Sequence, residues 1–217
     1  MTHVRRLCAM SLGVSALVAL NACVSSEGDR PAPVADSAPV ADSASVARAR
    51  LAADSLGPAL MGKLIGAIDS GGPEAAVAFC SDSAQALTAR FSHDGVQIRR
   101  VGTRVRNALN APDTLEQRIL QLYEAERVAG RPLAERSEVA HTGPNGSWEL
   151  RMFRPITLLD RCVACHGTPE QISPAVRALL ATRYPDDKAV GYAPGELRGA
   201  ISVRVPLPSV SASAPTK

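Results

Sequence analysis

The sequence predicts an α+β domain in which helices flank a small antiparallel sheet. The first observation is the order of its segments, which runs from helices through a strand, a helix, a strand pair and a short helix to a last strand. The second is an Asn-Gly turn signal between the paired strands, which is typical of a hairpin and therefore of antiparallel pairing. With 217 residues, of which 46% are hydrophobic, the chain is long enough for one domain with its own core.

Two helices are expected at the start of the domain. Apolar residues at near-helical spacing predict the first from Val46 to Ser70, and Gly71-Gly72-Pro73 ends it. Pro73 suits the first turn of a second helix, which runs to Phe91. One face of this second helix carries residues spaced by three and four, namely Val77, Cys80, Ala84, Leu87 and Phe91. We therefore expect Cys80 to point into the domain.

A strand and a third helix follow. Residues 96–101 alternate in the manner of a strand, and a turn-rich stretch, 106–113, comes after them. Asp113 or Thr114 can cap a helix that runs to Gly130.

The C-terminal part supplies the rest of the sheet. Ser137 to His141 and Trp148 to Ile156 are the two strands of the hairpin, with Asn145-Gly146 between them. A short helix at 173–182 and a strongly alternating strand at 198–207 complete the domain.

The N-terminus predicts an export signal and a lipid anchor. Arg5 and Arg6 precede an apolar stretch that is too short for a good membrane span. The sequence Leu20-Asn21-Ala22-Cys23 resembles the lipobox of bacterial lipoproteins, so we expect residues 1–22 to be removed and Cys23 to be lipidated. The alternative is an ordinary cleavage site with an incidental cysteine. Because Val24 is not the aspartate that argues for inner-membrane retention, we expect the protein on the periplasmic side, anchored in the outer membrane.

A flexible tether is expected between the anchor and the domain. Residues 23–45 are rich in Pro, Ala, Ser and Asp and repeat the sequence APVADS, a composition that buries too little apolar surface to become ordered. We place the domain at residues 46–210 and a disordered tail at 211–217. The formal net charge of +3 implies no nucleic-acid partner.

The segment Arg161-Cys162-Val163-Ala164-Cys165-His166-Gly167 carries the chemistry of the chain. C-x-x-C-H is typical of a c-type haem site, in which both thiols bind the haem covalently and the imidazole ligates the iron. A zinc site would need a fourth ligand from a second Cys or His pair, which the sequence lacks. A disulfide between Cys162 and Cys165 stays open as a further alternative, although such redox motifs usually lack the adjacent histidine.

One further cysteine of the domain, Cys80, has no cysteine left to pair with. Cys80 is either a small core residue or a thiolate that ligates the iron opposite His166. His93, His141 and Met152 are weaker candidates for that position, because the histidines lie in turn-like surroundings and Met152 alternates with core residues.

Four blocks of the sequence resemble a family of bacterial c-type haem domains with a PAS-like fold, long known only as a domain of unknown function. They are AVAFCSDSAQAL, IRRVGTRVRNALNAPD, FRPITLLDRCVACHGTPE and DDKAVGYAPGELRGAISVRVP. The resemblance implies an antiparallel sheet of about five strands with flanking helices, and a single covalent haem c. It also implies that Cys162 and Cys165 form the thioethers, His166 is the proximal ligand and Cys80 the distal ligand. Ala108 departs from the family, which usually has a proline there.

These features predict a membrane-anchored, single-haem cytochrome that acts in electron transfer or in redox or gas sensing. Its partner would be a redox or signalling protein, and the membrane is reached through the N-terminal lipid. The alternatives are a haem enzyme of the peroxidase type with a displaceable distal ligand, and a lipoprotein without haem. Four arginines either pair with the haem propionates or form a solvated face, namely Arg99, Arg100, Arg104 and Arg106.

Overall fold

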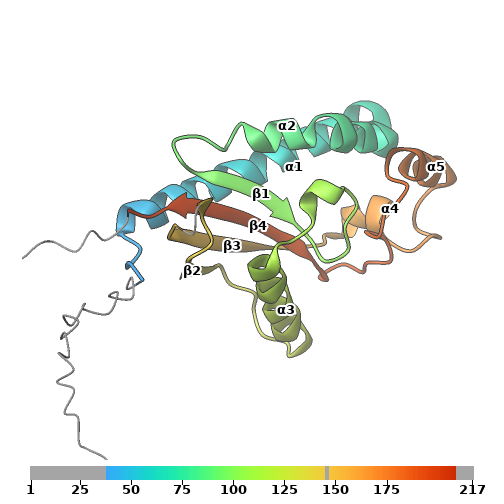
Figure 1. Ribbon diagram of the computed structural model, residues 1–217. Coiled ribbons are helices and arrows are strands. Elements are labelled where there is room, and N and C mark those ends of the chain that lie inside the picture. Colours follow the sequence, from blue (N-terminus) through green and yellow to red (C-terminus); the bar gives the residue numbers. More distant parts are fainter. Residues whose placement is uncertain (1–37, 145–146, 209–217) are drawn as a thin grey trace, which may run out of the picture. The chain divides into compact units, whose positions relative to one another are not determined.

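The computed structural model describes residues 38–144 and 147–208. The predictions on the signal peptide, on Cys23, on most of the tether, on the Asn145-Gly146 turn and on the 211–217 tail lie outside these residues. Within them the α+β fold class is confirmed, because helices flank an antiparallel sheet (Figure 1).

The sheet contains four strands in the order β1-β4-β3-β2. They are β1 (Gln97–Val101), β2 (Arg136–Ala140), β3 (Glu149–Thr157) and β4 (Leu197–Pro206). All neighbours are antiparallel, and β2 and β3 form the expected hairpin, with Ala140 opposite Glu149. The family resemblance implied about five strands. The described residues form four, and these are the four strands that the sequence itself predicted.

The first helix, α1 (Ser43–Asp82), contains the first expected helix and the first part of the second. It begins before Val46 because the Asp42 carboxylate accepts a hydrogen bond from the Ser45 N–H at 2.6 Å and caps the helix. Gly71 and Gly72 have non-helical backbone angles, so the expected break lies inside α1.

The second expected helix ends earlier than Phe91. Ser83 is non-helical, and a separate short helix, α2 (Ala84–Ala89), follows it. The Ser81 hydroxyl lies within hydrogen-bond distance of both the Asp82 carboxylate and the Ala78 carbonyl, at 2.7 and 3.0 Å, and its one hydrogen can be donated to either. Side-chain bonds of this kind compete with the helix, which explains a break that apolar spacing alone did not predict.

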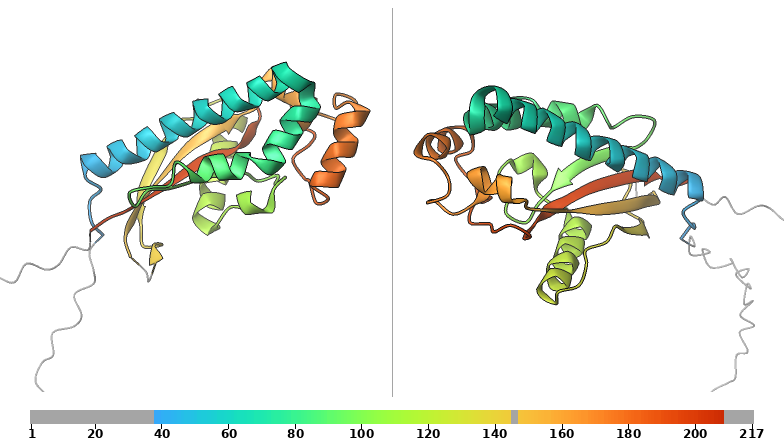
Figure 2. Two further views of the ribbon diagram at one scale, coloured as in Figure 1. Left: turned by 90° about the horizontal axis from the view of Figure 1, so that it is seen from above. Right: turned by 180° about the vertical axis from the view of Figure 1, so that it is seen from behind.

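The sheet has a different helix on each face (Figure 2). Ala49, Ala53 and Leu56 of α1 pack on one face against residues such as Ile98 and Val203. On the other face lies α3 (Thr114–Val128), which packs through a second apolar cluster made of Val101, Ile119, Leu120, Tyr123, Phe153, Leu197 and Ala200. The Asp113 carboxylate caps α3 as predicted, with Glu116 completing the capping box.

The C-x-x-C-H segment lies at one end of the sheet. It forms η3 (Asp160–Cys162) and α4 (Val163–His166), and α5 (Pro174–Arg183) packs beside the C-terminal part of α1. Strands β1 and β4 approach closely here, because a Cβ at Gly199 would lie 1.9 Å from the Val101 carbonyl oxygen. Only glycine therefore fits at residue 199.

Candidate functional site

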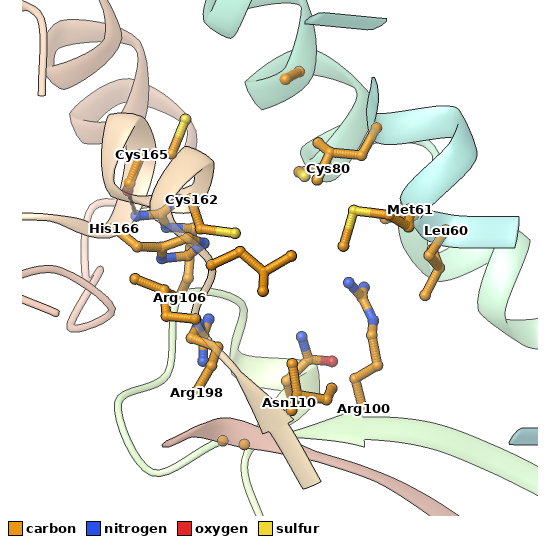
Figure 3. Close-up of a pocket in the computed structure, with 18 of the residues that line it drawn as sticks. Leu60, Met61, Cys80, Arg100, Arg106, Asn110, Cys162, Cys165, His166 and Arg198 are labelled. Carbon is orange, nitrogen blue, oxygen red and sulfur yellow. Dashed lines mark hydrogen bonds between the residues drawn. The ribbon is translucent and has the colours of Figure 1, made fainter. Parts of the chain in front are cut away.

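A cavity of about 310 Å³ lies where the ends of β1, β3 and β4 meet α1 and α4. Its volume is within the range of about 300–1,000 Å³ that small-molecule and cofactor sites have. The four predicted haem-binding residues, Cys80, Cys162, Cys165 and His166, all line it (Figure 3). The fold thus brings together two regions about 80 residues apart in the sequence.

The two cysteines and the histidine of C-x-x-C-H lie on consecutive short helical turns. Cys162 ends η3, Cys165 and His166 end α4, and the Gly167 N–H closes the turn by donating to the Val163 carbonyl at 2.9 Å. Cys162 and Cys165 are half-buried free thiols. Free thiols are the state that thioether attachment requires.

The imidazole of His166 is fixed by one hydrogen bond. Its Nδ1 lies 2.7 Å from the Ala189 carbonyl oxygen, which can only accept, so Nδ1 carries the proton and Nε2 keeps its lone pair. Burial lowers the pKa of His166 to about 3, and the charges of Arg106 and Arg198 act in the same direction. The imidazole is therefore neutral over the physiological range, as an iron ligand must be.

A brace of Arg106 and Asp187 holds the carbonyl that orients His166. Arg106 pairs with Asp187 at 2.9 Å and donates to the carbonyls of Cys165 and Ala189 at 2.5 and 3.2 Å. The second oxygen of Asp187 accepts the Ala189 N–H at 2.8 Å. These bonds connect the C-x-x-C-H turn to the 187–189 loop, so His166 and its acceptor are positioned together.

Cys80 faces the cavity from α1 (Figure 3). Burial raises the pKa of its thiol, although Arg100, Arg106 and Arg198 oppose this shift. A thiolate at this position therefore needs a stronger positive partner than the surrounding arginines, and a metal ion is such a partner.

Across the cavity from the C-x-x-C-H turn, and on the same side as Cys80, lies an apolar stripe of α1 (Figure 3). It consists of Leu60, Met61, Leu64, Ile65 and Ile68. By length and composition alone α1 is the one described helix that could cross a membrane. Its N-terminal part packs on the sheet, and its apolar stripe lines the cavity.

The arginines named from the sequence have different surroundings. Arg99 donates to the Leu109 and Ala111 carbonyls on the other side of β1, at 3.0 and 2.5 Å. Arg104 pairs with Glu196 at 3.1 Å and lies over the Tyr192 ring. Arg106 belongs to the brace, and Arg100 lines the cavity.

Sequence reasoning missed Arg198 and Asn110, which also line the cavity. Arg198 lies at the start of β4 and Asn110 in η1 (Ala108–Asn110), so only the tertiary fold brings them to this place. Their polar side chains at the edge of a strand and in a turn gave no signal in the sequence.

The weaker candidates for the distal ligand lie elsewhere. His93 is exposed and contacts Asp94, His141 stacks on Trp148, and Met152 is buried in the core between α1 and the sheet. None of the three is among the described residues that line the cavity.

The residues present fit a c-type haem better than a bare metal ion. Within 38–144 and 147–208, no three His, Cys, Asp or Glu side chains gather closely enough to hold a metal ion by themselves. A c-type haem places its two thioether sulfurs at the porphyrin edge and needs only axial ligands at the iron. An apolar wall, two free thiols, a neutral imidazole and a further thiol meet that requirement.

Comparisons with known proteins point to a haem protein. The Tll0287-like family model matches residues 19–206 of the chain. The crystal structure of the cyanobacterial haem protein Tll0287 has a similar fold, with a TM-score of 0.56 at 24% sequence identity, and the match covers 79% of this chain and 100% of that chain. No curated protein matches the chain. The family resemblance inferred from the sequence blocks is thereby confirmed.

Proposed function

Because the chain belongs to the Tll0287-like family, we propose that it is a haem protein with one covalently attached c-type haem. Cys162 and Cys165 form the thioether bonds, His166 is the proximal iron ligand and Cys80 the distal ligand. The observation that carries this proposal is the convergence of these four side chains on one cavity. The haem protein with the similar fold gives independent support.

The chemistry that the haem supplies when bound is the uptake and release of one electron at its iron. The chain contributes the surroundings that tune this chemistry. The Ala189 carbonyl keeps the proton on Nδ1 of His166 and so presents Nε2. A Cys80 thiolate favours oxidised iron, so we expect a low reduction potential.

Electron transfer or redox sensing suits this site better than peroxidase chemistry. A peroxidase needs an open iron position and a distal acid or base. Apart from His166, the cavity lining contains no His, Asp or Glu among the described residues. Gas sensing would require Cys80 to leave the iron.

The proposed location follows from the N-terminal sequence alone. The Leu20-Asn21-Ala22-Cys23 lipobox supports a lipid anchor at Cys23, with the haem domain on the periplasmic side of the outer membrane. A redox or signalling protein in the same compartment is the proposed partner. Incorporation of labelled palmitate into the wild type and its loss in Cys23→Ala test the anchor.

The haem proposal is tested on the domain expressed in the periplasm together with haem-maturation machinery. We expect an intact mass increased by one haem, and a low-spin, thiolate-type electron paramagnetic resonance signal from the oxidised protein. Cys162→Ser with Cys165→Ser should abolish covalent haem. Cys80→Ser should remove the thiolate signal and keep the haem.

The matched control is His93→Ala, which removes an exposed histidine outside the cavity. It should leave the mass and the spectrum unchanged. A wild-type mass without haem would refute the proposal, and a high-spin spectrum would refute Cys80 ligation and return peroxidase chemistry to consideration.

A further inference from the structure

The charges around the cavity are all of one sign. Its described lining contains Arg100, Arg106, Arg161 and Arg198 but neither Asp nor Glu. Arg106 is neutralised from outside the lining by Asp187, and Arg161 is exposed. Two arginines, Arg100 and Arg198, remain in the cavity without a carboxylate partner among the described residues.

Arg100 has no polar partner within the part of the chain that the structure describes. No hydrogen bond or ion pair reaches its guanidinium, and its Nε is buried without an acceptor. Burial lowers the pKa of Arg100, although the nearby thiol of Cys80 and hydroxyl of Tyr184 oppose the shift. Arg100 is half-buried, and a cation removed from water without a counter-ion is costly, so the fold keeps this group for an anion that is not part of the chain.

Arg198 also lacks a carboxylate partner among the described residues. Its Nη1 donates one hydrogen bond, to the Arg104 carbonyl at 3.2 Å, and its guanidinium lies 5.6 Å from the centre of the Tyr192 ring, a cation–π contact. The side chain passes over Gly102, where a Cβ would lie 2.7 Å from Nη1. Burial lowers the pKa of Arg198, with Tyr192 opposing this shift and the neighbouring cations Arg106 and Arg100 adding to it.

Asn110 lies between the two arginines at the floor of the cavity (Figure 3). Its Oδ1 accepts a hydrogen bond from Gln85 at 2.7 Å, which fixes the amide and leaves Nδ2 as a donor. The floor therefore offers two guanidinium groups and one amide, all of them donors.

We propose that Arg100 and Arg198, assisted by Asn110, bind the two propionate carboxylates of the haem. This inference rests on the proposed function, because attachment through Cys162 and Cys165 uses the vinyl groups and leaves both propionates ionised. Two carboxylates match two unpaired guanidinium groups, so each buried charge is neutralised. The cavity is thus specific for a dianionic porphyrin and selects against an uncharged one.

The test uses the haem-loaded domain and its variants Arg100→Met, Arg198→Met and Arg100→Lys. Covalent haem is verified by mass in each, which separates this test from that of the haem proposal. We expect each Met variant to lower the midpoint potential, because a lost cation disfavours the more negative, reduced state. The propionate bending band in the resonance Raman spectrum should shift in the Met variants, and Arg100→Lys should restore most of the wild-type values.

Arg99→Met is the matched control, because Arg99 is the neighbour of Arg100 on β1 but contacts carbonyls on the opposite side. It should leave the potential and the Raman band at the wild-type values. Unchanged Raman bands in both Met variants that still carry haem would overturn the proposal. If a Met variant fails to mature, the same comparison is made with Arg100→Gln and Arg198→Gln.

Discussion

Two groups of arginines lie on opposite faces of one sheet and differ in what neutralises them. Arg99 and Arg100 are neighbours on β1, and each belongs to a different group. The side of Arg99 holds an ionic cluster, which comprises Arg99, Arg151, Arg204, Asp113, Glu116 and Glu149. The side of Arg100 holds the cavity with its unpaired arginines.

The charges of the ionic cluster are balanced within the chain. Arg151 is 1% exposed and lies 2.9 Å from Asp113, 3.3 Å from Glu116 and 3.4 Å from Glu149. Arg204 lies 2.7 Å from Asp113, and Ser202 donates to Glu116 at 2.8 Å. Three arginines thus face three carboxylates, so the charges balance within the chain, although the Nε of Arg151 is buried without an acceptor.

The source of the counter-ions distinguishes arginines that stabilise the fold from arginines that bind a ligand. A buried cation whose counter-ions come from the chain stabilises one arrangement of the fold. A buried cation without them destabilises the empty protein and stabilises the loaded one, because the ligand brings the missing charge. Without haem, removing an arginine of the ionic cluster should therefore lower the free energy of unfolding, and removing an unpaired arginine of the cavity should raise it.

The largest effect is expected where the chain supplies the counter-ions. Arg151→Leu leaves Glu116 and Glu149 buried without their central cation, so we expect a loss of about 3–5 kcal/mol in the free energy of unfolding. Urea denaturation measures it, with or without haem. The control is Arg118→Leu, which breaks an exposed pair with Glu138 and should cost about 0–1 kcal/mol. Equal losses in the two variants would contradict the distinction.

A smaller effect is expected from turning a paired arginine of the cavity into an unpaired one. Asp187→Asn keeps an oxygen for the Ala189 N–H but removes the charge opposite Arg106, and should cost about 2 kcal/mol. Urea unfolding without haem measures this loss. The neighbouring, exposed Asp186→Asn is the control and should follow the wild type. No difference between the two would show that the brace is not held by charge.

The third prediction is a gain in the free energy of unfolding, where the first two are losses. Arg100→Met removes a buried cation that has no partner, so the protein without haem should gain about 1–2 kcal/mol in unfolding free energy. The haem-loaded variant should instead be less stable than the loaded wild type. Urea denaturation of both forms gives the two differences. A loss of stability in the empty protein would mean that Arg100 has a structural partner and belongs with the ionic cluster.

The sequence predicted those features that depend on neighbouring residues. The Asp113 cap, the break at Gly71-Gly72 and the hairpin follow from local chemistry, and the structure has all of them. The inward position of Cys80 followed from helical spacing. Strand alternation places Arg99 and Arg100 on opposite faces, but it does not tell which face holds a cavity.

The missed features depend on segments that meet only in the folded chain. Arg198 reaches the cavity because the register of β4 is irregular there, with Gly199 opposite Ile156 and Leu197 opposite Thr157, so that Arg198 leaves the face on which Ala200 lies. Asn110 reaches it through the turn that follows β1. Neither position has a periodic pattern, and pairing between distant strands cannot be derived from one sequence.

The smallest effect is a pH dependence that belongs to the ionic cluster. Burial by itself would raise the pKa of Asp113, but the Glu116 N–H and the cations Arg151 and Arg204 outweigh it, and the pKa lies below the usual 3.8. A carboxylate with a lowered pKa stabilises the fold above its unfolded pKa, and this stability is lost as the pH falls through the folded value.

Asp113→Asn keeps the helix cap, because an asparagine oxygen also accepts the Glu116 N–H. The variant should therefore be less stable than the wild type at pH 7, and the difference should shrink below about pH 4. Urea unfolding between pH 7 and 3 measures it, with the exposed Asp69→Asn as the control. A difference that stays constant over this range would mean that the charge of Asp113 contributes nothing, and the cluster would then be held by its hydrogen bonds alone.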